Sequence, residues 1–508
     1  MSLVPKSPKW LFWGCFIALI TTAFGFILRA FLMGEWAKEF NFSATQQGEL
    51  FGVGLWPFAI SIIIFSLIID KIGYKTAMIF GFVCHMVSLV MTVTASSYEG
   101  LYWANFVVAL GNGTVEAYIN PVVATQFKND KSRWLNILHA GWPGGLVLGG
   151  LLVLALGGIG WKYQMLLIAV PAIIYLIILL AQEFPINERV AAGGSYHDML
   201  KEVGAGGAFI IIFLIFAELA RVLINPKVFS PETIANNQFL SLQVGAAVAA
   251  VVAIGFFAYV KSFGRPIFIL LLLIMVPLAT TELGVDGWVT ELMKPILGKD
   301  GPYVLLYTSL LMMILRFCSG PILHKLSPLG VLATCSLLAA LGLIALSHAA
   351  GAAMIFAAAT LYAVGKTFFW PTMLGVVAEQ CPKGGALTLN ATGGVGMLGV
   401  GVIGAMLLGN IQDTTLDSTV KAKAPQVHEK VMVDKTSLLG AYKAVDETKL
   451  AAATPEEQKI VADAKAGVQQ STLEKFSILP LLMMACYIGL ILWFRSKGGY
   501  KPVDAGAH

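Results

Sequence analysis

Charged side chains are scarce in this sequence. Asp, Glu, Lys and Arg make up 12% of its 508 residues, whereas 57% are hydrophobic, and average soluble proteins carry about 25% charged residues. Many apolar stretches reach the ~18 residues that a helix needs to cross a bilayer. The shortage of charge excludes a soluble enzyme, and the net charge of +5 gives no reason to expect a nucleic-acid partner. We therefore expect an all-α polytopic membrane protein whose surroundings are a lipid bilayer.

The motifs of metal and cofactor chemistry are also missing. We find no phosphate-binding loop, zinc motif or nucleophile elbow, and the six cysteines lie in or beside apolar segments, which argues against a disulfide framework. Gly394-x-Gly396-x-x-Gly399 has the spacing of a dinucleotide fingerprint, but it lies inside an apolar segment with no strand before it. Close helix packing explains these glycines better. The sequence thus predicts neither an enzyme nor a cofactor.

Fourteen apolar stretches are the predicted membrane spans. They lie near 10–32, 48–69, 76–96, 99–124, 134–156, 163–182, 208–224, 239–260, 266–290, 303–323, 329–348, 352–378, 386–409 and 476–494. The first is too long for the core of a cleaved signal peptide. Short loops rich in Lys and Arg alternate with loops that hold few, and Lys/Arg-rich loops face the cytoplasm. This rule predicts that both termini are cytoplasmic and that the protein lies in the cell (inner) membrane.

A long polar loop, 410–475, separates the last two spans and is expected outside the cytoplasm. Thr454-Pro455-Glu456-Glu457 combines an N-cap, a proline at the first helical position and a capping glutamate. This pattern predicts a helix from Pro455 to about Ala466. We expect the loop to be a solvated helical appendage without a site of its own.

The fourth predicted span carries a carboxylate, an amide and a proline close together. Glu116 and Asn120 are four residues apart and share one face of a helix, and Pro121 follows directly. A carboxylate costs roughly 2.5–3.5 kcal/mol at a bilayer centre, so such groups are functional by default. This face is a candidate site for handling a proton or a substrate, and packing against a partner helix is the alternative.

The two halves of the chain resemble each other. Glu116 and Lys366 each stand five residues before a proline, and Asn136 and Asn390 each follow a leucine at the start of the next span. Repeats of six spans indicate two bundles around a midplane site, with the two spans of 208–260 as an inserted hairpin. The predicted divisions are an N-terminal six-helix bundle (1–183), a cytoplasmic linker with the inserted hairpin (184–265), a C-terminal six-helix bundle that includes the polar loop (266–499) and a cytoplasmic tail (500–508).

The turn Asp70-Lys71-x-Gly73-x-Lys75 resembles the loop between spans two and three of the major facilitator superfamily. Within that superfamily, the stretch from Gly111 to Pro121 is similar to the fourth span of the fucose/galactose/glucose–proton symporters. Leu135-Asn136 fits their pattern too, and Glu282-Leu-Gly-Val-Asp286-Gly-Trp288 fits it loosely. The resemblance covers nearly the whole chain except 208–260 and 410–475. It implies alternating access between two bundles. The first span departs from the fucose type, because it carries Arg29 and no carboxylate.

We expect Glu116 to be the proton-coupling acid, since a carboxyl in apolar surroundings can bind and release a proton near neutral pH. Sodium coupling is the alternative, and it would require more oxygen ligands. Lys366, its counterpart in the repeat, could pair with Glu116, bind an anionic substrate, or hold backbone carbonyls before Pro371. Sugar sites combine aromatic faces with amides and carboxylates. The expected substrate-binding residues are Asn120, Asn136, His139, Trp142, Glu282, Trp288, Lys366, Trp370 and Asn390.

A second group of charged residues is expected to act in gating. Arg29 lies near the outer end of the first span, and Glu282 and Asp286 lie near the outer end of the span at 266–290. We expect Arg29 to latch onto one of these acids when the outer gate closes, with snorkelling of Arg29 to the interface as the alternative. Arg316 is close to the cytoplasmic end of its span and is expected to be a structural gate residue. The predicted gating set is Arg29, Asp286, Asp70, Lys71 and Arg316.

Three functions remain open at this point. The first is import of a small polar solute, a hexose-like sugar, by proton symport, with the protein as a monomer. The second is uptake of an anionic solute such as a sugar acid, bound by Lys366 and Arg29. The third is a membrane receptor or assembly protein that engages a partner through the 410–475 loop. The internal repeat and the buried Glu116 favour transport.

Overall fold

The structure is a computed structural model that describes residues 7–40, 50, 52–224, 240–437 and 440–504. Within these ranges, 11 helices are long and apolar enough to cross a membrane, or 12 if the bent pair of α17 (Pro302–Phe317) and α18 (Ser319–Lys325) is a single span. Helices α3 (Trp56–Ile72) and α5 (Tyr98–Gln126) occupy the two other predicted positions, and α5 is more polar because it carries Asn105, Asn112, Glu116 and Asn120. The chain is a multi-pass helical membrane protein, and a count of about 14 helices fits.

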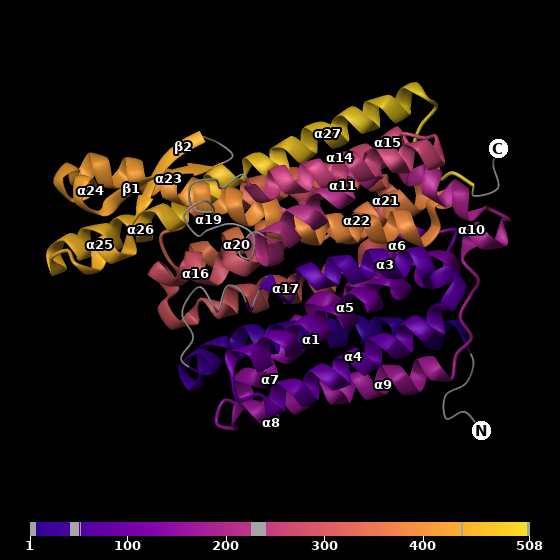
Figure 1. Ribbon diagram of the computed structural model, residues 1–508, viewed down its shortest axis with the longest axis horizontal. Helices are drawn as coiled ribbons and strands as arrows, with labels where there is room; N and C mark the ends of the chain where they lie inside the picture. The colour runs from indigo at the N-terminus through magenta and orange to yellow at the C-terminus, as the bar shows by residue number, and fades with distance from the viewer. Residues whose placement is uncertain (1–6, 41–49, 51, 225–239, 438–439, 505–508) are drawn as a thin grey trace.

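The first group of helices fills the lower part of Figure 1. It consists of α1 (Pro8–Glu39), α3 (Trp56–Ile72), α4 (Tyr74–Thr94), α5 (Tyr98–Gln126), α6 (Lys131–His139), α7 (Gly141–Ala155), α8 (Trp161–Leu166) and α9 (Ala169–Leu180). Glycines allow the closest crossings. A Cβ at Gly145 in α7 would lie 2.6 Å from the carbonyl oxygen of Ile20 in α1, and a Cβ at Gly113 in α5 would lie 2.2 Å from the carbonyl oxygen of Phe58 in α3. We call this group the N-bundle.

The second group, which we call the C-bundle, fills the upper part of the same view. Its helices are α15 (Pro266–Ala279), α16 (Val285–Leu297), α17 (Pro302–Phe317), α18 (Ser319–Lys325), α19 (Pro328–Ser347), α20 (Ala352–Lys366), α21 (Phe369–Gln380), α22 (Gly385–Gly399) and α27 (Ile478–Ser496). The glycines of Gly394-x-Gly396-x-x-Gly399 face Ile63, Trp370 and Val276 at contact distance. Close packing of α22 therefore accounts for this motif, as its apolar setting predicts.

Between the bundles the chain passes through α10 (Glu188–Ala191) and a helical hairpin, α11 (Tyr196–Leu219) and α14 (Leu240–Val260). The hairpin packs against the C-bundle, chiefly through α11 on α22 and α15. Its base is a crossing of two glycines, because a Cβ at Gly204 would lie 1.9 Å from the backbone nitrogen of Gly264. Both have positive φ, 57° and 97°, a conformation that glycine adopts without a steric penalty. Arg265 pairs with Glu202 at 3.3 Å beside this crossing.

Two predicted boundaries are corrected by the structure. The span predicted at 266–290 continues through a π-helical turn, Thr280–Gly284, and α16 as far as Leu297. Glu282 and Asp286 therefore lie inside a long helix, because the apolar pattern runs on through Val289, Met293 and Leu297. The span predicted at 386–409 likewise continues, through α23 (Ala405–Lys423), well beyond its predicted end.

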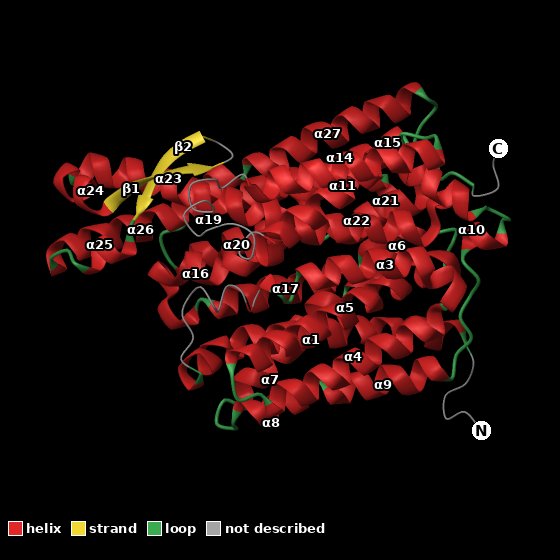
Figure 2. Ribbon diagram, viewed as in Figure 1, coloured by secondary structure: helices red, strands yellow, loops and turns green. Residues whose placement is uncertain are grey.

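The 410–475 loop is a folded unit that contains the predicted helix from Pro455 and also a pair of strands that the sequence did not indicate; the expectation that it has no site of its own stays a prediction. It contains part of α23, then α24 (Pro425–Val431), the antiparallel hairpin β1 (Met432–Ser437) and β2 (Gly440–Val445), α25 (Glu447–Ala451) and α26 (Pro455–Phe476). Figure 2 shows the two strands of this hairpin in yellow, and they lie far from the two chain ends. Leu416, Val420, Val431 and Val461 belong to a small apolar core of its own. The predicted capping box at Thr454 and Glu457 begins α26, which is longer than predicted.

Both chain ends lie on the same side of the molecule, at the right of Figure 1, and the folded unit lies on the opposite side. We refer to these as the termini side and the far side. The two bundles meet along α3, α5, α6 and α7 of the first and α17, α18, α21 and α22 of the second.

Candidate functional site

Glu116 lies in the middle of α5, where its side chain is buried and bonded to the next turn of the same helix. Asn120 donates a hydrogen bond from Nδ2 to Glu116 Oε2 at 2.5 Å, and its Oδ1 lies 2.9 Å from His139 Nε2 at the end of α6. With Nδ2 directed at the carboxylate, Oδ1 is the acceptor, so His139 Nε2 carries the ring proton. The three predicted site residues therefore form one hydrogen-bonded row. Among the described residues, Glu116 has no basic partner.

The row continues into the C-bundle through Arg316. Its Nη1 donates to the backbone carbonyl of His139 at 2.7 Å, its Nε donates to the carbonyl of Thr367 at 2.7 Å, and its Nη2 pairs with Glu282 Oε1 at 2.9 Å. The side chains of Arg316 and Glu282 are only 1% and 3% exposed. Arg316 lies at the 64° bend between α17 and α18, and it reaches Glu282 in the π-helical turn. Arg316 therefore belongs to this central network, and its role as a gate residue stays a prediction.

Lys366 pairs with Asp286 in the structure, through a hydrogen-bonded contact from Nζ to Oδ1. Of the alternatives for Lys366, the pairing with Glu116 is thus not the one formed. Its Nζ also lies 5.1 Å from the ring centre of Tyr362, and the hydroxyl of Tyr362 donates to the carbonyl of Thr281 at 2.7 Å. Lys366 and Asp286 come from the end of α20 and the start of α16, which the sequence separates by 80 positions.

The three tryptophans that were predicted to bind substrate, Trp142, Trp288 and Trp370, differ in their surroundings. Trp370 lies in the first turn of α21, where its backbone N–H donates to Glu282 Oε2 at 3.2 Å, and its ring packs against Gly396 of α22. Trp142 is half-buried, with its ring centre 5.6 Å from that of Phe26. The backbone of Trp288 lies in α16, but its side chain is outside the part of the chain that the structure describes.

The two repeat-related asparagines both link the bundles. Asn136 Nδ2 donates to Thr372 Oγ1 in α21 at 3.0 Å, and Asn390 Nδ2 donates to the carbonyl of Ala117 in α5 at 2.9 Å. Both are fully buried, and the amide oxygen of each has no hydrogen-bond partner within the described residues. Thr372 was not singled out by its sequence, because a threonine in an apolar span is common.

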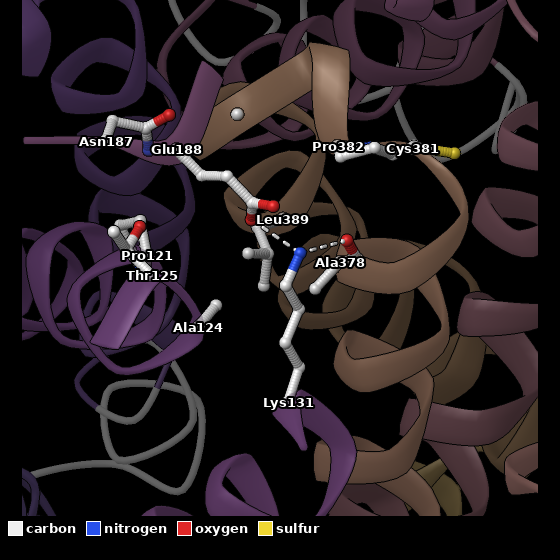
Figure 3. Close-up of a pocket in the computed structure, with 11 residues that line it drawn as sticks. Pro121, Ala124, Thr125, Lys131, Asn187, Glu188, Ala378, Cys381, Pro382 and Leu389 are labelled. Atoms are coloured by element: carbon white, nitrogen blue, oxygen red, sulfur yellow. Dashed lines mark hydrogen bonds and ion pairs between the residues drawn. The ribbon is translucent and has the colours of Figure 1, made fainter. Parts of the chain in front are cut away.

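Closer to the termini side, α6 and α21 are fastened together by residues that sequence reasoning missed. Glu379 Oε1 accepts hydrogen bonds from the backbone N–H and the hydroxyl of Ser132, at 3.3 and 2.5 Å. Lys131 donates to the carbonyl of Ala378 at 3.2 Å and pairs with Glu188 of α10 at 2.6 Å, as Figure 3 shows. These bonds form what we call the seam.

The seam borders a small, partly open cavity between α5, α6, α10, α21 and the start of α22, which Figure 3 shows around Lys131. Its volume of about 20 Å³ has room for roughly a single water. Ala124, Cys381 and Leu389 are among its lining residues. The two bundles are therefore closed against each other on the termini side.

The predicted turn residues Asp70 and Lys71 lie on the termini side of α3. Asp70 pairs with Arg189 of α10 at 2.5 Å, and Lys71 lies 5.5 Å from the ring centre of Tyr196 at the start of α11. Arg189 is buried and also donates to the carbonyl of Gly194. This contact ties the N-bundle to the segment between the bundles.

Arg29 has neither of its predicted acidic partners in this structure. Its guanidinium donates to the carbonyl of Gly25 at 3.0 Å and to the hydroxyl of Ser88 in α4 at 3.1 Å, while Glu282 and Asp286 are paired inside the C-bundle. His85, which no sequence pattern indicated, lies one turn before Ser88 and bridges Tyr175 at 3.1 Å and Asn112 at 2.9 Å.

Comparisons with known proteins give one family. The family model described as Major Facilitator Superfamily matches residues 14–409. A comparison with curated protein sequences finds no match. Among solved structures, the chain is similar to the E. coli fucose:proton symporter, with 14% identity, a TM-score of 0.53, and coverage of 94% of this chain and 99% of that one.

Two further solved structures have different substrates in their descriptions. A proton:xylose symporter matches at 11% identity and a TM-score of 0.61, covering 96% of this chain and 95% of that one. The human organic anion transporter MFSD10 matches at 13% identity and a TM-score of 0.59, covering 95% and 100%. At these identities the likeness concerns the fold alone.

Proposed function

Because the chain belongs to the Major Facilitator Superfamily, we propose that it is a secondary active transporter that imports a small neutral polar solute, a sugar, together with a proton. The two bundles would rock around the central network, so that the solute site opens to one side at a time. In this proposal the termini side is cytoplasmic, the membrane is the inner membrane, and the transporter works as a monomer.

The observation that carries the proposal is the charge balance of the central network. Glu282 with Arg316 and Asp286 with Lys366 form two ion pairs that cancel. The charge of Glu116 is left over, with only the amide of Asn120 as its hydrogen-bond partner among the described residues. An ionised Glu116 is therefore an uncompensated charge inside the membrane, which costs roughly 2.5–3.5 kcal/mol. One bound proton makes the network neutral.

This balance suggests how a proton could be coupled to a solute. A proton taken from the outside would convert Glu116 to the neutral acid, which the apolar surroundings favour when the bundles rearrange. Release of that proton on the cytoplasmic side would restore the carboxylate. The row from Glu116 through Asn120 and His139 to Arg316 connects the acid to the opposite bundle. The protonation state of Glu116 can thus affect the contact between the two bundles.

The same two ion pairs favour a neutral solute over an anionic one. Both cations of the C-bundle network, Arg316 and Lys366, already have acidic partners, so an anionic solute would have to break a buried ion pair in order to bind. The amide oxygens of Asn136 and Asn390 have no partner within the described residues. Free acceptors of this kind suit the hydroxyl groups of a sugar.

Transport of an anion remains the second candidate, because Arg29 is a buried cation whose described partners are neutral. A sugar acid could use it if the first span turned Arg29 toward the opposite bundle. The receptor hypothesis is less well supported, because the far-side unit has its own core and contains none of the predicted site residues.

The decisive experiment measures substrate-driven pH change in proteoliposomes across a panel of neutral sugars and sugar acids. We expect a neutral sugar to drive proton uptake in the wild type. In Glu116→Gln we expect that proton movement to be lost while sugar exchange continues, because the amide mimics the protonated acid. Glu99→Gln is the matched control, since Glu99 lies in the exposed first turn of the same helix.

Three results would contradict the proposal. A sugar acid that moves protons when no neutral sugar does would support the anion candidate. Undiminished proton movement in Glu116→Gln would remove Glu116 from the coupling. Transport that is lost equally in Glu99→Gln would show that the effect is not specific to the buried acid.

A further inference from the structure

The chain after the last span turns back toward the bundles. Helix α27 ends at Ser496, and Gly498 and Gly499 follow with φ of 90° and 98°. The N–H of Gly499 donates to the carbonyl of Phe494 at 2.9 Å, which closes the helix end. Because side chains are disfavoured at positive φ, these two glycines set the direction of the tail that follows.

The tail, which we define as residues 499–504, is docked on the end of α21 by three hydrogen bonds. The hydroxyl of Tyr500 donates to Glu379 Oε2 at 2.7 Å, the N–H of Val503 donates to the carbonyl of Glu379 at 2.8 Å, and Gln380 Nε2 donates to the carbonyl of Lys501 at 2.8 Å. The ring of Tyr500 also packs edge-on against Phe494, with 5.1 Å between ring centres. The contact is therefore made by side chain and backbone together.

Glu379 is the residue that joins the tail to the seam. Its Oε2 faces Tyr500, and its Oε1 accepts both bonds from Ser132 of the N-bundle. Removal from water, and then the charge of Glu379, raise the pKa of Tyr500 well above its usual value, so the hydroxyl remains a donor. Because Tyr500 holds Oε2, the carboxylate of Glu379 keeps one orientation. In that orientation its Oε1 accepts the hydrogen bonds from Ser132.

We propose that the tail is a strap that keeps the seam closed by holding Glu379 in the orientation that binds Ser132. Tyr500 acts as a positioning residue, since its hydroxyl binds Glu379 in the C-bundle, and Glu379 in turn binds Ser132 of the N-bundle. The inference rests on the proposed function in that alternating access requires the seam to open. Releasing the tail would free Glu379 to rotate, weaken its bonds to Ser132, and raise the fraction of molecules open on the termini side.

The test measures the rate at which a small hydrophilic maleimide labels a cysteine in the seam, with the full transporter in nanodiscs. Cys381 lines the seam cavity and is 1% exposed, so labelling requires opening; the other five cysteines are replaced by serine. We expect Tyr500→Phe to raise the labelling rate about tenfold, as for the loss of one hydrogen bond to a charged acceptor. Truncation after Lys497 should raise it at least as much.

Matched variants separate the strap from simpler effects. Truncation after Asp504 keeps the three hydrogen bonds of the tail, and the truncated protein should be labelled at the wild-type rate. A second probe, Ala124→Cys in a background without the native cysteines, lines the same cavity from α5 in the other bundle. It should respond in parallel with Cys381. In a Ser132→Ala background, Tyr500→Phe should add less than a twofold increase, because Glu379 no longer has a hydroxyl partner to be aimed at.

Several results would overturn the strap. If Tyr500→Phe is labelled at the same rate as the wild type, the strap is refuted, even if the truncated chain fails to fold. A rise at Cys381 without a rise at Ala124→Cys would mean that the tail merely covers Cys381. A full effect of Tyr500→Phe in the Ser132→Ala background would show that Tyr500 does not act through Ser132. Labelling needs neither a solute nor a proton, so failure of the sugar–proton proposal would leave these outcomes unchanged.

Discussion

The buried pair of Arg316 and Glu282 gives a sharp prediction about stability. Arg316→Met would leave Glu282 with the N–H of Trp370 at 3.2 Å as its remaining described hydrogen bond. Both charged side chains are almost fully buried, and leaving one buried charge without its partner costs about 3–5 kcal/mol. We expect the free energy of unfolding to fall by about that amount.

The converse variant should be less harmful. In Glu282→Leu, Arg316 keeps two backbone carbonyl partners, those of His139 and Thr367, each at 2.7 Å. The double variant, Arg316→Met with Glu282→Leu, removes both charges and should be more stable than Arg316→Met alone, since apolar side chains can replace a buried ion pair at little cost. Reversible unfolding in mixed micelles measures all four proteins of this double-mutant cycle.

An exposed pair on the far side provides the control. Lys443 and Asp434 lie 3.8 Å apart with side chains 43% and 87% exposed, and the same cycle with Lys443→Met and Asp434→Asn should show no measurable coupling. A coupling energy below about 0.5 kcal/mol between Arg316 and Glu282 would contradict this prediction, because buried charges in contact should exceed that value.

Two further predictions concern packing and the far-side unit. Gly145→Val should strongly lower thermal stability, because its Cβ would meet the Ile20 carbonyl at 2.6 Å, whereas Gly158→Ala should not, since no atom of the described residues lies within 4 Å of its Cβ; equal melting temperatures would refute the close crossing of α1 and α7. Replacing 416–470 with a flexible linker should preserve solute uptake, since this unit has its own core; loss of uptake by a well-expressed deletion variant would favour a receptor-like role.

Much of the fold could be predicted from the sequence. Long apolar runs give the positions of the membrane helices, and the turn at Asp70 with the stretch around Glu116 indicated the superfamily that the family model confirms. The capping box at Thr454 predicted the start of a helix, and α26 begins there. These features are local, because hydropathy and capping depend on residues within a few turns of one another.

The ends of elements and the folded unit were predicted less well. The helix that holds Glu282 and Asp286 continues to Leu297, and its amphipathic continuation could not be told from a loop boundary by apolar content. In the 410–475 region, five spaced valines together with Leu416, Met432 and Ala464 build a core between α23, α24 and α26. Such a core depends on contacts across long separations, which periodicity within one segment does not reveal.

The sequence by itself determined that the chain crosses a membrane many times and which buried charges it must accommodate. Glu116, Arg316, Glu282, Lys366 and Asp286 are all visible as costly residues within or beside apolar spans. Only the tertiary structure decided which of them pair, because the partners are 34 and 80 positions apart. Their attraction depends on distance in space. The strap at Tyr500 and the lone charge of Glu116 follow from those packed positions, and no local pattern encodes them.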